Sequence, residues 1–149
     1  MIQVKRMIKK ILFLALAMAM ALYYAPCGAE NGTMKIRLKV GDTALTATLI
    51  DSKTNQDFIS LLPLTLTLKD YAGTEKIGDL PKRLSTEGAP SGSDPSVGDI
   101  TYYAPWGNLA IFYRDFGYAS GLVILGKIDR GIETFNVPGS VKVTIELIK

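Results

Sequence analysis

Aromatic side chains are concentrated in one short stretch of this sequence. Seven of the ten aromatic residues after position 30 lie between residues 102 and 118. Tryptophan and tyrosine join a large apolar surface to one polar atom, which suits the binding of peptides or small ligands. We therefore predict a ligand-binding groove lined by five residues of this stretch: Tyr103, Trp106, Phe112, Tyr118 and, as a polar anchor, Arg114.

The same aromatic stretch also fits a purely structural role. Successive side chains of a strand point to opposite faces, so Phe112 and Tyr113 cannot face the same side. About half of the cluster is therefore expected to pack in the core, where aromatic residues are common. Which of these two residues faces the interior decides whether a groove exists.

The composition excludes several kinds of catalytic and metal site. The chain of 149 residues has no histidine and a single cysteine, so it cannot form a Ser-His-Asp or Cys-His catalytic pair, a histidine zinc site or an internal disulfide. No spacing of acidic residues forces two carboxylates together, and the glycines of residues 85–98 lack the setting of a phosphate-binding loop. We predict no metal and no cofactor, and Arg114 is the one candidate catalytic residue.

The first 29 residues have the pattern of a signal peptide. Four basic residues within the first ten precede the uncharged, mostly apolar stretch 11–25, and small residues follow at 27–29. The apolar stretch is shorter than the ~18 residues expected of a membrane span. We expect cleavage after Ala29 and an exported protein, periplasmic or secreted. Lipidation at Cys27 and a retained N-terminal anchor are the alternatives.

Beyond this leader the charges are balanced. Four of the 17 basic residues and none of the 14 acidic residues lie before Glu30, which leaves a net charge near −1 on residues 30–149. No cluster of lysine or arginine remains to neutralise phosphates, so we expect no nucleic-acid partner. The expected partner is a peptide or a small molecule, and membrane contact is expected only through the leader before its cleavage.

Residues 30–149 are expected to form one domain of short strands and two short helices. Apolar and charged residues alternate over 34–40 and 140–148, which is typical of half-buried strands. Ser52 or Thr54 begins the first helix, which Pro63 ends, and the second helix is expected within 129–135. The other predicted strands are 44–50, 64–68, 99–104, 108–114 and 122–128, with an extended piece near 76–77. Strands and turn signals about 8–12 residues apart indicate a closed barrel or a sandwich.

Three stretches of the sequence resemble one protein family. GDITYYAPWGNLAIFYRDFGY, LLPLTLTLKDYAGTEKI and DLPKRLSTEGAP are similar to segments of the small bacterial cyclophilin-like family. The resemblance implies a mainly β fold, a closed eight-stranded cyclophilin-like β-barrel with two short capping helices, over residues 30–149. Set beside true cyclophilins, it implies that Phe112 is the pocket phenylalanine and that Tyr118 stands where they have a tryptophan.

The resemblance also implies where an isomerase would keep its catalytic residues. Cyclophilins that isomerise X–Pro bonds use an arginine on the strand after the first helix, but residues 64–69 contain none, and their pocket histidine is absent. Our first hypothesis is therefore a module that binds a peptide or small ligand, with residues 85–98 as a lid. The alternative is a weak peptidyl-prolyl cis-trans isomerase acting on exported proteins, with Arg83 or Arg114 as substitute. A purely structural or interaction role is the third hypothesis.

Overall fold

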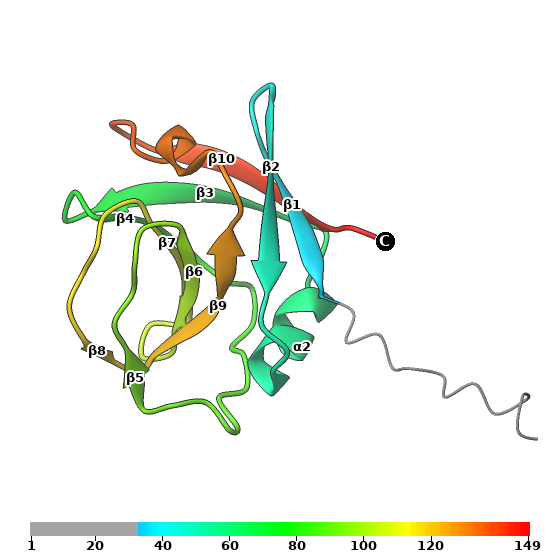
Figure 1. Ribbon diagram of the computed structural model, residues 1–149, viewed down its shortest axis with the longest axis vertical. Helices are drawn as coiled ribbons and strands as arrows, with labels where there is room; N and C mark the ends of the chain where they lie inside the picture. The colour runs from blue at the N-terminus through cyan, green and yellow to red at the C-terminus, as the bar shows by residue number, and fades with distance from the viewer. Residues whose placement is uncertain (1–32) are drawn as a thin grey trace, which may run out of the picture. The chain divides into compact units, whose positions relative to one another are not determined.

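Eight antiparallel strands close into a barrel in the computed structural model, which describes residues 33–149 (Figure 1). Around the barrel the strands follow the order β1-β10-β3-β4-β7-β6-β9-β2. The predicted leader, residues 1–29, and its cleavage site lie outside the described residues. The barrel strands are β1 (Lys35–Val40), β2 (Thr43–Leu49), β3 (Leu64–Tyr71), β4 (Glu75–Asp79), β6 (Asp99–Tyr103), β7 (Asn108–Phe112), β9 (Leu122–Ile128) and β10 (Val141–Leu147).

Alternating side chains fill the interior of the barrel. In β1 the apolar residues Ile36 and Leu38 are fully buried, while the basic residues between them stay exposed. In β3, Leu68 is buried and its alternating threonine neighbours are exposed. Each buried strand face therefore adds to one interior core, as the two-residue period predicts.

The two ends of the barrel are closed in different ways. Helix α2 (Lys53–Ser60) begins at Ser52, whose Oγ accepts a hydrogen bond of 3.1 Å from the Asn55 N–H, and its Phe58 is fully buried in the core. At the other end a single 3-10 turn, η1 (Ile132–Thr134), is followed by the fully buried Phe135. The second predicted helix is thus only one turn long.

Local residue types explain why that second helix is so short. Gly131, just before η1, has a φ of 88°, which lies in the left-handed region that a helix cannot contain. After η1 the segment Asn136–Ser140 carries Pro138 and Gly139, which favour a turn. Four residues, 132–135, remain between these two interruptions, and η1 takes up three of them.

A second, smaller apolar cluster lies on the outer face of the barrel wall. All five residues of β7 are buried, so this strand is covered on both faces. Leu109 and Ile111 belong to the interior core, whereas Ala110 and Phe112 belong to the outer cluster together with Leu122. A strand buried on both faces indicates that other parts of the chain cover the outside of the barrel there.

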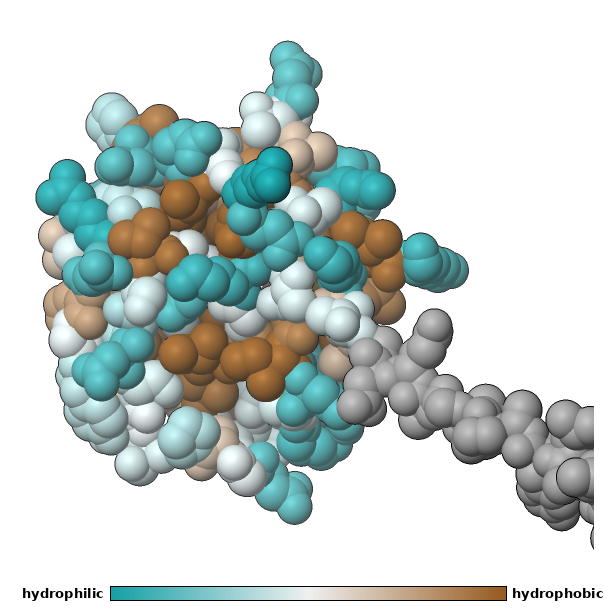
Figure 2. Space-filling view, in the orientation of Figure 1, coloured by the Kyte–Doolittle hydropathy of each residue, from teal (hydrophilic) through white to brown (hydrophobic). Residues whose placement is uncertain are grey.

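Apolar side chains also reach the surface of the domain. On the face seen in Figure 2, hydrophobic residues form several patches separated by hydrophilic ones. None of the helices within residues 33–149 has the length and apolarity that a membrane crossing requires. The large hydrophobic residues that are exposed are Ile50, Tyr71, Val97, Trp106, Phe116, Tyr118, Val137 and Leu147.

Candidate binding pocket on the barrel wall

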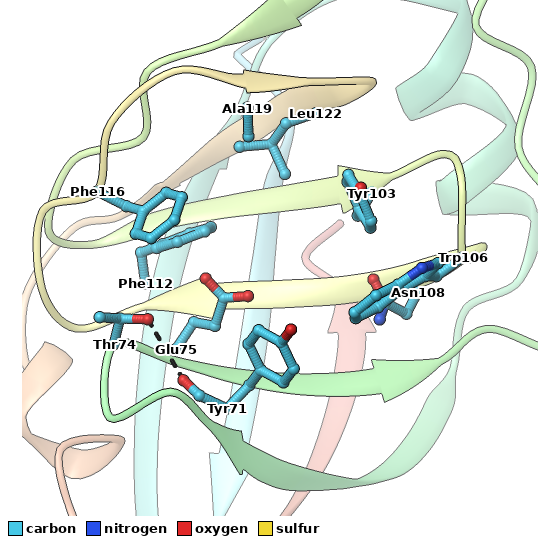
Figure 3. A pocket seen from close by; sticks show the side chains of 10 residues that line it. All are labelled: Tyr71, Thr74, Glu75, Tyr103, Trp106, Asn108, Phe112, Phe116, Ala119 and Leu122. Atoms are coloured by element: carbon cyan, nitrogen blue, oxygen red, sulfur yellow. Dashed lines mark hydrogen bonds between the residues drawn. The ribbon is translucent and has the colours of Figure 1, made fainter.

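Three of these exposed aromatic residues meet at one cavity. It measures about 200 Å³ and lies over the outer cluster, against strands β3, β4, β6 and β7 (Figure 3). We call it the aromatic pocket. Its lining residues are Tyr71, Thr74, Glu75, Tyr103, Trp106, Asn108, Phe112, Phe116, Ala119 and Leu122.

Aromatic rings form two walls of the aromatic pocket. The Trp106 ring centroid lies 5.6 Å from that of Tyr71 and 5.2 Å from that of Tyr103, with the ring planes nearly perpendicular in both pairs. Opposite them, the Phe112 and Phe116 centroids are 6.3 Å apart. Edge-to-face and tilted arrangements of this kind are favourable for aromatic pairs. Trp106 is nevertheless 53% exposed and Phe116 49% exposed, so the rings border an open space.

Strand pairing places the lining residues side by side. Glu75 on β4 is directly opposite Tyr71 on β3 and opposite Phe112 on β7. The tight turn that joins β3 to β4 spans three residues, 72–74, and has positive φ angles at Ala72 and Gly73, 52° and 63°. Three strands therefore bring residues that are far apart in sequence to one spot.

Glu75 is the one charged residue among those that line the aromatic pocket. Its carboxyl group is half-buried and has no hydrogen-bond or ion-pair partner within residues 33–149. Burial among the rings raises the pKa of Glu75 to about 7, because a desolvated carboxylate is costly. In the same part of the chain no group of three or more acidic, cysteine or histidine residues could hold a metal ion.

Comparisons with known proteins identify the family of this chain. The model of the cyclophilin-like family matches residues 38–146. The chain belongs to the cyclophilin-like family. A hypothetical protein from Archaeoglobus fulgidus, determined in solution, is similar with a TM-score of 0.61 and 16% identity, over 80% of this chain and 98% of the other. At that identity the likeness shows the fold alone, and no curated protein matches the chain.

The opposite side of β4 anchors the aromatic pocket of this cyclophilin-like domain. Lys76 is fully buried, and its Nζ donates hydrogen bonds to Asp70 Oδ1 at 2.9 Å, to Val137 O at 2.6 Å and to Gly139 O at 2.7 Å. Because side chains alternate along a strand, an inward Lys76 requires Glu75 to face outward. The buried lysine thus fixes which face of β4 the carboxyl group occupies.

Three of the five predicted groove residues of the cyclophilin-like domain lie together. Tyr103, Trp106 and Phe112 line the aromatic pocket, whereas Arg114 and Tyr118 do not. Arg114 borders a separate depression beside Asp70. Phe112 faces outward, whereas Tyr113 packs with the interior core. Of these two neighbours, Tyr113 is therefore the one that faces the interior.

The predicted lid, residues 85–98, does not line the aromatic pocket. Its short strand β5 (Gly92–Ser93) pairs with β8 (Ala119–Ser120), and Ser91 O accepts a hydrogen bond of 2.7 Å from the Gly121 N–H. Tyr118, 58% exposed, lies against this segment with its hydroxyl 3.2 Å from Ser91 Oγ. The segment that borders the pocket is instead 113–121, which supplies Phe116 and Ala119.

The two arginines considered as isomerase substitutes stand away from the aromatic pocket of the cyclophilin-like domain. Arg83 donates from Nη1 to Ala104 O at 2.7 Å, which supports the turn between β6 and β7 from outside. Arg114 lies at the separate depression described above. Neither guanidinium group lines the aromatic pocket.

Sequence reasoning missed Tyr71 and Glu75. The strand 64–68 was predicted to end three residues before Tyr71, and the piece near 76–77 to begin after Glu75. The signal in the sequence is the turn at Ala72–Gly73, which places the ends of both strands near it, but a two-residue loop there would pair Tyr71 with Thr74. In the structure Thr74 is a third loop residue, and this extra residue is what pairs Tyr71 with Glu75.

The raised pKa of Glu75 predicts a pH-dependent stability. The carboxyl group binds its proton more tightly in the folded chain, with a pKa of about 7, than at its ordinary value of 4.5. The free energy of unfolding should therefore fall as pH rises from about 4.5 to about 7, because over this range the folded state holds a proton on Glu75 that the unfolded state has already lost.

Urea denaturation at several pH values measures this contribution. Glu75→Gln should flatten that part of the stability profile, while Glu87→Gln, at an exposed position, should leave the profile of the unsubstituted protein unchanged. Identical slopes for Glu75→Gln and the unsubstituted protein would contradict the assignment.

Proposed function

We propose that this cyclophilin-like domain is a binding module that holds a small organic ligand, or one side chain of a peptide, in the aromatic pocket. The observation that carries the proposal is the convergence of Tyr71, Trp106 and Phe116 on one cavity although each is substantially exposed. Exposed apolar residues are normally scattered over a monomer, and gathered ones mark interaction sites.

The size of the cavity limits what it holds. Pockets for drug-sized ligands measure roughly 300–1,000 Å³, whereas this one measures about 200 Å³. A single ring or an amino-acid side chain matches the smaller space. The export expected from the leader belongs to the same proposal and is supported by the sequence pattern of residues 1–29.

The proposal does not extend to prolyl isomerisation. That activity needs a donor directed at the prolyl nitrogen, and neither Arg83 nor Arg114 borders the aromatic pocket. Ring-lined surfaces favour holding an apolar group, which needs no such donor.

Trp106 makes the proposal directly testable, because it is the chain's single tryptophan and lies in the pocket wall. Titration with benzylammonium, benzyl alcohol and benzoate, three probes of similar size and different charge, should give a saturable change in its fluorescence for at least one probe. Phe116→Ala should weaken that binding about 2- to 10-fold, since aromatic contacts contribute ~0.5–1.5 kcal/mol.

Tyr118→Ala is the matched control for this titration. It removes another exposed aromatic side chain from the same segment, but one outside the aromatic pocket, so the dissociation constant should stay unchanged. No saturation with any probe, or equal weakening by both substitutions, would overturn the proposed binding function.

A further inference from the structure

We propose that the group held in the aromatic pocket is an organic cation, a protonated or methylated amine whose charge lies between the Glu75 carboxylate and the surrounding rings. This inference rests on the proposed binding function and adds the chemical class of the ligand. It is carried by the charges and hydrogen-bond acceptors that line the cavity.

Glu75 supplies a negative charge that nothing in residues 33–149 neutralises. Its carboxyl group rises from β4 between the rings of Tyr71 and Phe112 (Figure 3). A neutral ligand seated there would remove water from the carboxylate and offer no charge in return, and an anion would be repelled. A cation offsets the desolvation, so the site favours a positively charged group.

The neighbouring charged groups are directed elsewhere. On β3 and β4, Asp70 and Lys76 pair with each other at 2.9 Å. On the segment after β7, the Asp115 carboxylate accepts a hydrogen bond of 2.9 Å from the Val97 N–H, and Arg114 borders the separate depression. The remaining titratable groups at the cavity are the phenols of Tyr71 and Tyr103.

A second acceptor accompanies the carboxyl group. Asn108 lines the pocket from β7, is 3% exposed, and its Oδ1 has no hydrogen-bond partner within residues 33–149. A buried acceptor without a partner is uncommon, and an ammonium group has the N–H donors that would satisfy it. Because this oxygen is shielded from solvent, it favours a cation through its partial negative charge, and it accepts a hydrogen bond from the ligand only if the Asn108 side chain turns toward the cavity.

The aromatic walls of the pocket also attract cations. The faces of aromatic rings carry partial negative charge, and tryptophan attracts cations most strongly. Five rings border this cavity, with Trp106 between Tyr71 and Tyr103. Rings around a carboxylate thus form an environment that prefers an alkylammonium or arylammonium group to a neutral group of equal size.

Protonation of Glu75 competes with such a ligand. Because burial raises the pKa of Glu75 to about 7, the carboxyl group is largely neutral at pH 5.5 and ionised at pH 8. Cation binding should therefore strengthen with rising pH. A neutral ligand, which prefers the uncharged acid, should show the opposite trend.

The decisive experiment compares benzylammonium with benzyl alcohol, which has nearly the same shape, by Trp106 fluorescence. At about pH 8 we expect benzylammonium to bind at least about tenfold more tightly, and to weaken about tenfold or more at about pH 5.5. In the Glu75→Gln variant the affinity for benzylammonium should fall to that for benzyl alcohol. Glu87→Gln, at an exposed position away from the pocket, should leave the preference intact.

The outcomes separate this inference from the proposed function. Equal affinities for the two probes, or a preference for benzylammonium that survives Glu75→Gln, would overturn the cation assignment while the pocket remained a binding site. Absence of saturation with both of these probes and with benzoate would overturn the binding function itself. The pH titration uses the unsubstituted protein, so it decides the question even if Glu75→Gln folds poorly.

Discussion

Replacing Gly126 by alanine is expected to destabilise the barrel by about 3 kcal/mol. A Cβ atom at this position in β9 would lie 2.2 Å from Thr48 O and 2.9 Å from Leu49 Cα, both in the backbone of β2. Overpacking usually costs ~1–3 kcal/mol, and the upper end applies because a backbone cannot rotate away as a side chain can. The contact is steric, since Gly126 does not have a positive φ.

Chemical denaturation with far-UV circular dichroism measures this effect. Gly117→Ala is the matched control, because a Cβ there meets no atom within 4 Å and the φ angle of Gly117 is not positive. The control should unfold at almost the same denaturant concentration as the unsubstituted protein. If both substitutions shift the midpoint equally, close contact between β9 and β2 is not the reason for glycine at position 126.

Replacing Lys76 by methionine is expected to cost about 3 kcal/mol of stability. Methionine keeps most of the volume but removes the donor that satisfies Val137 O and Gly139 O. Val137 and Gly139 are exposed residues, so water replaces part of each lost bond, and each of the three bonds of Lys76, the one to Asp70 included, contributes ~1 kcal/mol.

Thermal denaturation compares this substitution with Lys142→Met. Lys142 is an exposed residue of β10, so its replacement removes a lysine without removing buried hydrogen bonds. The melting temperature of the Lys142→Met variant should stay close to that of the unsubstituted protein. Lys76→Met should melt several degrees lower, at roughly 2–8 °C per kcal/mol. Equal melting temperatures for the two variants would show that the buried network contributes little.

The strands of this barrel could be predicted because each is a local pattern. The strand expected at 122–128 is observed as Leu122–Ile128, and the alternation over 34–40 appears as the exposed and buried residues of β1. The helix expected between Ser52 and Pro63 is observed as Lys53–Ser60. Periodicity, turn residues and a helix cap act over a few residues, so they are visible in the sequence itself.

The members of the aromatic pocket that could be predicted lie at the ends of two strands and in the turn that joins them. Tyr103 and Phe112 end β6 and β7, and the turn between these strands carries Trp106, so all three lie where the pattern implies. Arg114 and Tyr118 follow the last strand residue, in an irregular segment where alternation no longer says where a side chain points. Their distance from the cavity reflects that change in backbone.

The sequence by itself determined that this chain is built of short strands, as a closed barrel or a sandwich, that histidine and thiol pairs take no part in its chemistry, and that rings gather near one hairpin. Only the tertiary structure decided that Phe112 rather than Tyr113 faces outward and that Glu75 stands among the rings. The physical reason is that these facts depend on register between strands β3, β4 and β7, and β4 and β7 are separated by about thirty residues of chain. Pairing across such a distance is set by burial of the whole barrel, which no local pattern contains.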